Sequence, residues 1–173
     1  ILNKAAGMPV HPSQGHHENT LANALAYRFA SRGEHFVFRA VNRLDRDTTG
    51  LLLIAKHKIS GAFLSAMTAK KEIRREYLAI VSGKPEEYGT IDLPIARKDG
   101  STIERCIDME HGEHAVTHYR CLDYRDDLDC SLVLLRLETG RTHQIRVHMA
   151  HIGHPILGDT VYGAKKPVPG LQG

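Results

Sequence analysis

Short connections between strand-like segments constrain the fold of this chain more than any other feature of its sequence. Parallel strands need a crossover of a dozen or more residues, usually a helix, whereas antiparallel strands need only a turn. Most connections here are too short for helical crossovers, so the pattern predicts a mixed α+β fold with a largely antiparallel sheet and flanking helices. The strand-like segments lie at 50–56, 74–82, 115–122 and 131–138.

Three segments carry helical signals. Residues 19–33 begin with the start signals Asn and Thr and end at a glycine, and residues 59–70 have the apolar spacing of a second helix. We expect Thr142 to cap a third helix that runs through residue 152. One face of this third helix would carry Ile145, His148, Met149 and Ile152.

Length and composition favour one soluble domain over residues 1–173. With 173 residues, of which 42% are hydrophobic, the chain can bury one sizeable core. No run approaches the roughly 18 apolar residues of a membrane span, and no basic-then-apolar leader precedes Ile1. We therefore expect a cytoplasmic protein without membrane association. Neither a disulfide framework nor a zinc site is indicated by the three cysteines, Cys106, Cys121 and Cys130.

Charge is unevenly distributed, although the net charge is only +3. Residues 39–75 contain nine Lys or Arg and three acidic residues, whereas residues 104–129 contain eight acidic residues and three basic ones. Such an uneven distribution of charge is typical of a protein that presents a basic face to a polyanion, most often a nucleic acid. A solvated surface of mixed sign explains the same counts, so charge alone does not decide.

The segment VNRLDRDTTG, residues 41–50, places Asp45 between Arg43 and Arg46 in a polar turn before a predicted strand. Neighbouring positive charge favours the ionised form of a carboxylate. Three roles stay open for it: a structural anion, a metal ligand, and a nucleophile or base. From the local sequence alone, a turn-capping aspartate is the preferred interpretation, because Asp side chains often bond backbone donors in turns.

Four late histidines invite a metal interpretation, which their spacing disfavours. His143, His148, His151 and His154 are separated by five, three and three residues and lack an HExxH-type pattern. We therefore expect no metal. Arg146 lies at the margin of the apolar face of the predicted helix, from where an arginine can reach into a site while its stem packs.

These segments together resemble the RluA-type family of RNA pseudouridine synthases. NRLDRDTTGLLLIAK is similar to the family's H-R-L-D-x-x-T-S-G motif, and the match continues in order along nearly the whole chain. Departures occur at Ala5, Asn42 and Thr49, where proline, histidine and serine are usual. The further matching blocks are ILNKAAGMPVHPS (1–13), REYLAIVSG (75–83), GEHAVTHY (112–119) and LETGRTHQIRVHMAHIGHPILGDTVYG (137–163).

The resemblance implies the pseudouridine synthase fold and a catalytic role for Asp45. Isomerisation breaks the N1–C1′ bond of uridine, rotates the uracil and re-attaches it through C5, which needs no cofactor. It does need a carboxylate beside the sugar, and Asp45 could attack C1′ or deprotonate C2′. By resemblance, Arg146 pairs with Asp45, and Tyr77 stacks on the target base and assists loss of the C5 proton.

The resemblance also suggests which residues bind RNA. Arg43 matches the arginine that enters the space left by the flipped uridine, because a uridine inside folded RNA is otherwise out of reach. Phosphate contact is the interpretation for the other basic residues, with a solvated face as an equal alternative for the cluster at 70–75. The predicted RNA-binding set is Arg43, Arg46, Lys70, Lys71, Arg74, Arg75, Arg141 and His143.

The expected substrate is large-subunit ribosomal RNA, with transfer RNA as the second choice, both by family analogy. Two other classes remain open: an enzyme that excises a base or cleaves a glycoside, with Asp47 as second carboxylate, and a catalytically silent RNA-binding module. We expect a monomer. Members of the family that this chain resembles often carry a small RNA-binding domain at the N-terminus, and we expect no such separate domain within residues 1–173.

Overall fold

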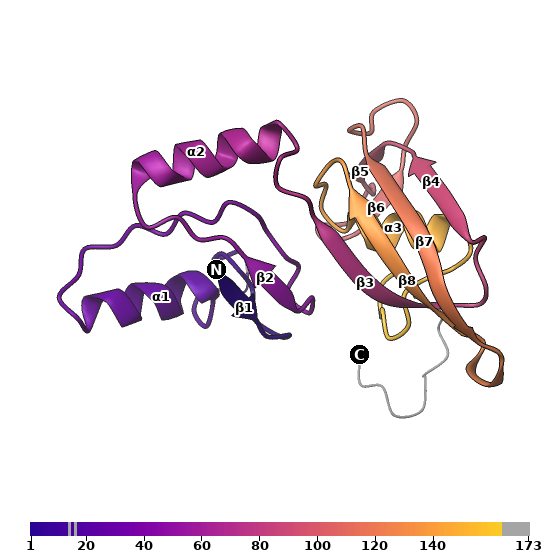
Figure 1. Ribbon diagram of the computed structural model, residues 1–173, viewed down its shortest axis with the longest axis horizontal. Coiled ribbons are helices and arrows are strands. Elements are labelled where there is room, and N and C mark those ends of the chain that lie inside the picture. Colours follow the sequence, from indigo (N-terminus) through magenta and orange to yellow (C-terminus); the bar gives the residue numbers. More distant parts are fainter. Residues whose placement is uncertain (14, 16, 164–173) are drawn as a thin grey trace. The chain divides into compact units, whose positions relative to one another are not determined.

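The computed structural model describes residues 1–13, 15 and 17–163, and the chain forms two compact units, Ile1–Ile73 and Arg74–Gly173. Figure 1 shows that the first unit carries β1, β2 and the two longer helices, and that the second carries the larger sheet. Within the described residues, none of the helices combines the length and the apolar character that crossing a membrane requires.

The first unit is built on a small antiparallel pair and two helices. Strands β1 (Leu2–Lys4) and β2 (Gly50–Leu52) pair with Leu2 opposite Leu52. Helix α1 (Leu21–Ala30) begins at the predicted cap, because the Thr20 side chain accepts a hydrogen bond from the backbone N–H of Asn23. Helix α2 (Lys58–Ala69) also lies where the sequence predicts it. The core of this unit contains Val10, Leu21 and Leu52.

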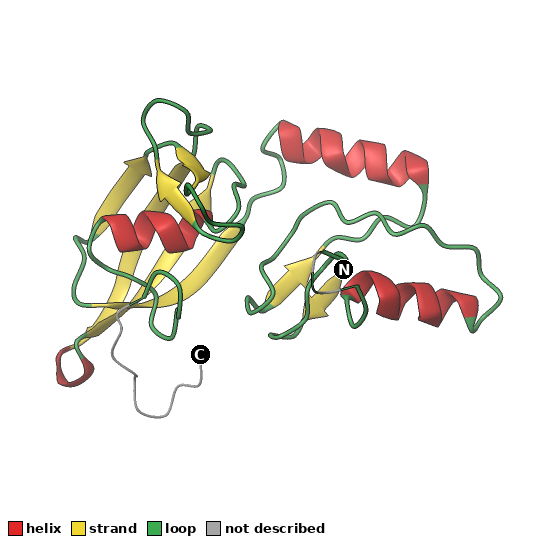
Figure 2. Ribbon diagram, turned by 180° about the vertical axis from the view of Figure 1, so that it is seen from behind, coloured by secondary structure: helices red, strands yellow, loops and turns green. Residues whose placement is uncertain are grey.

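The second unit is a four-stranded antiparallel sheet with one helix on its buried face. The strand order is β3-β8-β7-β4, with β3 at Glu76–Ser82, β4 at Tyr88–Asp92, β7 at Val116–Arg125 and β8 at Cys130–Leu137. A 3-10 turn at Asp126–Leu128 joins β7 to β8. Helix α3 (Gln144–His151) packs on the sheet in Figure 2 through a core of Val81, Ile91, Val133, Leu135 and Met149.

A separate hairpin completes the second unit. Strands β5 (Ile95–Arg97) and β6 (Arg105–Ile107) pair antiparallel, with Arg97 opposite Arg105. Every strand pairing among the described residues is antiparallel, which confirms the predicted mixed α+β class. Strands β4, β5 and β6 were not predicted, since segments of three to five residues are too short to show a period-2 pattern.

Two predicted boundaries are wrong. The strand predicted at 50–56 is shorter, at Gly50–Leu52, and beyond it Ile54 forms only an isolated antiparallel bridge with Ala40. The third helix does not begin at Thr142: it begins at Gln144, and His143 precedes it in the left-handed conformation with φ of 58°. The cause is the buried side chain of Gln144, whose Oε1 accepts hydrogen bonds from the backbone N–H of Arg141 and the hydroxyl of Thr139. These bonds hold the preceding loop outside the helix.

His148 is a buried polar residue that links α3 to the sheet. Its side chain is 0% exposed; Nε2 donates to the carbonyl of Leu93 at 2.9 Å, and Nδ1 lies 2.9 Å from the hydroxyl of Thr117. Burial lowers the pKa of His148, and the bond to the Leu93 carbonyl opposes this only in part. The neutral imidazole is therefore the form that the fold favours.

The buried imidazole predicts a pH dependence of stability. Because the pKa of His148 is lower in the folded state than in the unfolded one, its contribution is present above about pH 6.5 and is lost as the pH falls below that value. Urea unfolding at pH 7.5 and pH 5.0 should show a larger acid loss for the wild type than for His148→Gln. His35→Gln, a change at an exposed histidine of the first unit, is the control. An equal acid loss in wild type and His148→Gln would contradict this interpretation.

Candidate active site

Asp45 lies in the loop that leads into β2, here called the Asp45 loop (residues 41–50). Asp45 is partly buried, and its backbone carbonyl accepts a hydrogen bond from Thr48 N at 3.2 Å, which closes a tight turn. Asn42 fixes the start of the loop to the strand, since its Oδ1 accepts from Leu53 N at 2.8 Å and its Nδ2 donates to Leu51 O at 3.1 Å. The loop is thus fixed at its start and closed by a turn at Asp45.

Lys4 binds the backbone of the Asp45 loop, a role that was not predicted from the sequence. Its side chain is 2% exposed, and its ammonium donates to the carbonyls of Ala5, Met8 and Arg46 at 2.7–2.9 Å. All three ammonium donors are used in this way. Burial lowers the pKa of Lys4, while the negative charges of Asp47 and Asp45 raise it. A lysine in a short strand is ordinarily expected to be exposed to solvent, so no local sequence pattern indicates that Lys4 is buried.

The two arginines of the Asp45 loop are exposed. Arg46 forms a two-pronged ion pair with Asp47, with Nε–Oδ1 at 3.0 Å and Nη2–Oδ2 at 2.9 Å. Exposed pairs of this kind contribute little to stability, because solvent screens them. A phosphate could therefore replace Asp47 as the partner of Arg46 at small cost. Arg43 is exposed on the same loop.

Arg146, on α3, is held by a buried carboxylate that the sequence analysis missed. Its Nε lies 2.7 Å from Oδ2 of Asp159 and its Nη2 lies 2.9 Å from Oδ1. The Asp159 side chain is only 4% exposed, and that of Arg146 is 22% exposed. A bidentate pair of this geometry fixes the plane of the guanidinium group. Asp159 engages two of the five N–H donors, so the other three point away from it.

The loop around Asp159 is shaped to hold this carboxylate. Oδ1 of Asp159 also accepts the backbone N–H groups of Val161 and Tyr162 at 2.9 and 3.1 Å. Burial alone would raise the pKa of Asp159, but the bonds from Arg146 and from these two backbone groups bring it below its usual value. Asp159 is consequently ionised at neutral pH. The signal lay in the segment GDTVYG, at the end of the last matching block.

Tyr162 covers the other side of Arg146. Its ring centroid lies 4.9 Å from the guanidinium carbon, at cation–π distance. The Tyr162 hydroxyl accepts the backbone N–H of Arg105 at 2.7 Å and lies 2.8 Å from Nδ1 of His143. The predicted RNA-binding residue His143 is therefore part of the network around Arg146.

Tyr77, on β3, pairs with Leu135 across the sheet and packs against the core of the second unit while staying partly exposed. Tyr77 and Arg146 thus lie in the second unit, and Asp45 lies in the first. Because the predicted partners Asp45 and Arg146 lie in different units, their ion pair stays a prediction.

The remaining predicted RNA-binding residues fall into two groups. Lys70, Lys71 and Arg74 are exposed. Arg75 and Arg141 have anchored side chains: Arg75 donates to the carbonyl of Glu138 at 3.2 Å, and Arg141 donates to the carbonyl of His114 at 3.0 Å and forms an ion pair with Glu113.

No group of three His, Cys, Asp or Glu side chains that could hold a metal ion occurs among the described residues. Of the four late histidines, His143 bonds Tyr162, His148 bonds Thr117 and Leu93, and His154 lies 2.9 Å from the carbonyl of Ser82. The three cysteines are free thiols.

Comparison with known proteins gives a consistent family. A family model described as RNA pseudouridylate synthase matches residues 1–151. The chain belongs to the RNA pseudouridylate synthase family. Among solved structures, human RNA pseudouridylate synthase domain containing 1 aligns with a TM-score of 0.76 at 29% identity, covering 94% of this chain and 65% of that one. The expected pseudouridine synthase fold is thereby confirmed.

Curated members of the RNA pseudouridylate synthase family include close relatives of this chain. Ribosomal large subunit pseudouridine synthase D of Zymomonas mobilis is 47% identical over 171 residues, which are 96% of this chain and 53% of the relative. An uncharacterized RNA pseudouridine synthase of Bacillus subtilis, YhcT, is 44% identical over 94% of this chain and 54% of the relative. The chain thus spans about half the length of these relatives.

The Arg146–Asp159 pair predicts a large stability loss when its buried carboxylate is neutralised. Asp159→Asn keeps the size but leaves Arg146 without its counter-charge, which should lower the free energy of unfolding by about 3 kcal/mol. Urea unfolding at pH 7 measures this loss. Asp127→Asn, which breaks an exposed two-pronged pair with Arg125, is the matched control and should cost less than about 1 kcal/mol. Equal losses in the two variants would contradict the role given to burial.

Proposed function

We propose that this protein isomerises specific uridines in RNA to pseudouridine, and that its substrate is large-subunit ribosomal RNA. The activity is supported by family membership across residues 1–151. The substrate is supported by the names of relatives: ribosomal large subunit pseudouridine synthase D of Zymomonas mobilis, and proteins of the same name from Pseudomonas aeruginosa and Haemophilus influenzae at 42% and 44% identity. The observation that carries the proposal is the match of the family model to residues 1–151, a range that contains Asp45, Tyr77 and Arg146.

In the proposed reaction, Asp45 acts beside the ribose of the target uridine. Its carboxylate either attacks C1′ or removes the C2′ proton as the N1–C1′ bond breaks. The detached uracil anion then rotates, and its C5 forms a bond to C1′ as the bond from Asp45 to C1′ breaks or the C2′ proton is returned. The C5 proton is lost and N1 gains a proton, so that product and substrate have the same composition. The reaction consumes no cofactor. Anchoring of the Asp45 loop by Lys4 and Asn42 supports this role, since a loop residue aimed by a rigid support can be positioned for chemistry.

The proposed role of Arg146 is to pair with Asp45 and keep it ionised and oriented in a partly desolvated site. Asp159 and Tyr162 act as positioning residues for Arg146. Asp159 binds one edge of the guanidinium group and the Tyr162 ring packs on its face, so its plane is fixed. Tyr77 would stack on the flipped base, a role suited to an aromatic side chain that is partly exposed.

RNA binding would rest on exposed basic residues of the two units. Arg43 would fill the space of the flipped uridine, and Arg46, Lys70, Lys71 and Arg74 would contact phosphates, as their exposure permits. Arg75 and Arg141 are anchored to the protein, so we assign them mainly to shaping the surface. We further propose that the protein acts as a monomer in the cytoplasm.

Asp45→Asn tests the chemistry. An amide keeps the shape of the side chain but is neither a useful nucleophile nor a base, so pseudouridine formation should fall by about 10³-fold or more. Tritium release from RNA labelled at uridine C5 measures turnover, and filter binding shows whether RNA affinity is kept. Asp47→Asn, two residues away in the same loop, is the control and should stay within about tenfold of wild type. Normal release by Asp45→Asn would exclude the assignment.

Arg146→Met and Arg146→Lys test the proposed pair with Asp45. The methionine variant should lose about 10²-fold or more in turnover, because Asp45 loses the charge that keeps it ionised. Lysine should restore only part of the activity, since it keeps the charge but lacks the planar, two-pronged donor geometry. RNA affinity should change little in either variant. If binding and turnover fell in equal proportion, Arg146 would be a phosphate contact instead.

A further inference from the structure

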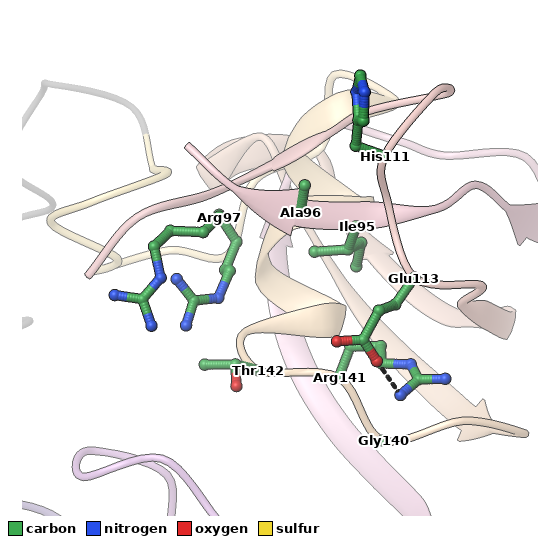
Figure 3. A pocket seen from close by; sticks show the side chains of 9 residues that line it. Ile95, Ala96, Arg97, His111, Glu113, Gly140, Arg141 and Thr142 are labelled. Atoms are coloured by element: carbon green, nitrogen blue, oxygen red, sulfur yellow. Dashed lines mark hydrogen bonds and ion pairs between the residues drawn. The ribbon is translucent and has the colours of Figure 1, made fainter. Parts of the chain in front are cut away.

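A pocket of about 350 Å³ lies in the second unit, between the β5–β6 hairpin and the loop before α3. Figure 3 shows Arg97 on one side of it, the Arg141–Glu113 ion pair on the other, and Thr142 between them. The pocket has no place in the function described so far. Its lining residues are Ile95, Ala96, Arg97, Arg105, His111, Glu113, Gly140, Arg141 and Thr142.

The hairpin that walls the pocket has an unfavourable charge arrangement. Arg97 and Arg105 occupy directly opposite positions of the antiparallel pair, so their Cα atoms are about 5 Å apart and their side chains leave the same face. Like charges in this arrangement destabilise a sheet. One position further along, Lys98 pairs with Glu104 at 2.5 Å, the opposite-charge combination that a hairpin ordinarily favours.

Within the described part of the chain, neither arginine has a carboxylate partner. Arg97 donates to the carbonyl of Thr102 at 3.1 Å and Arg105 to the carbonyl of Glu104 at 3.2 Å. Each of these bonds uses one of five donors, which leaves most of both guanidinium groups for a ligand. The pocket therefore concentrates positive charge that the protein does not neutralise.

The chemistry of the lining matches an anion with several oxygens. Three guanidinium groups and one carboxylate line the pocket, an excess of two positive charges, and Glu113 is already paired with Arg141. Two planar guanidinium groups side by side suit the bidentate recognition of a phosphate, and the Thr142 hydroxyl adds a further donor. The volume is sufficient for a phosphodiester with its sugar.

The pocket is connected to the network around Arg146. The backbone N–H of Arg105 donates to the Tyr162 hydroxyl, and the Tyr162 ring covers the Arg146 guanidinium. Arg105, which lines the pocket, is therefore hydrogen-bonded to a residue that contacts Arg146. This proximity favours a phosphate of the bound substrate over an unrelated anion.

We propose that the pocket between the β5–β6 hairpin and the loop before α3 is a subsite for a backbone phosphate of the substrate RNA, close to the target uridine. The subsite rests on the proposed function. Arg97 and Arg105 hold the phosphodiester from one wall, and Thr142 contacts it from the other. The electrostatic repulsion between Arg97 and Arg105 is offset when the RNA phosphate binds between them.

Arg97→Gln and Lys98→Gln form a matched pair for the test. Each removes one positive charge, from the last residue of β5 and from the residue after it, and only Arg97 lines the pocket. The probe is large-subunit ribosomal RNA transcribed in vitro. Arg97→Gln and Arg105→Gln should each raise KM and the Kd for RNA about tenfold, far more than they change kcat. The slope of log Kd against log salt concentration should become smaller by about 1, the change expected when one phosphate contact is lost. Lys98→Gln should change KM less than about twofold.

Thermal unfolding without RNA separates this subsite from a structural role. Relief of the like-charge contact should leave the Tm of Arg97→Gln unchanged or higher, whereas a structural arginine would lower it. The subsite is overturned if Arg97→Gln leaves KM and the salt slope unchanged, if Lys98→Gln has an equal effect, or if kcat falls while KM does not. Failure of the proposed function would look different, since the wild type itself would then form no pseudouridine.

Discussion

The buried ion pair between Arg146 and Asp159 is the interaction on which the arrangement of the second unit's candidate site depends. A carboxylate that is 4% exposed is stable only when it is paired and hydrogen-bonded, and Asp159 receives two donors from Arg146 and two from the backbone. The same bonds orient the guanidinium on α3 and shape the loop that carries Tyr162. The cluster of Arg146, Asp159 and Tyr162 therefore both stabilises the fold and orients the arginine proposed for catalysis.

The first unit also contains a buried charged residue, in this case a cation, Lys4. Lys4 is buried, and three carbonyls satisfy its ammonium, one of them from Arg46 in the Asp45 loop. Each of the two candidate active-site groups, Asp45 and Arg146, is thus supported by a buried charged residue that does not itself face the substrate in the proposed mechanism. Such support limits the movement of a catalytic group without occupying the site.

The sequence predicted the elements with long patterns and missed features that depend on tertiary contacts. Helices α1 and α2 and strands β3, β7 and β8 follow from start signals and from apolar residues spaced over segments of seven residues or more. The start of α3 was misplaced, because Gln144 binds the preceding loop through its side chain, which no local pattern shows. Asp45, Tyr77 and Arg146 were chosen by family resemblance. Asp159 was missed, because its partner lies 13 positions away on another element.

The central claim is that the protein isomerises uridine within RNA, and the balance of products tests it most directly. Ribosomal RNA labelled with ¹⁴C in its uracil rings would be incubated with the protein and digested to nucleosides, and uridine, pseudouridine and free uracil would then be quantified. We predict that the loss of uridine equals the gain of pseudouridine, with no free uracil, because the detached base is re-attached at C5. Release of free uracil would instead identify an enzyme that excises the base, and bound RNA with unchanged uridine content would identify a binding module.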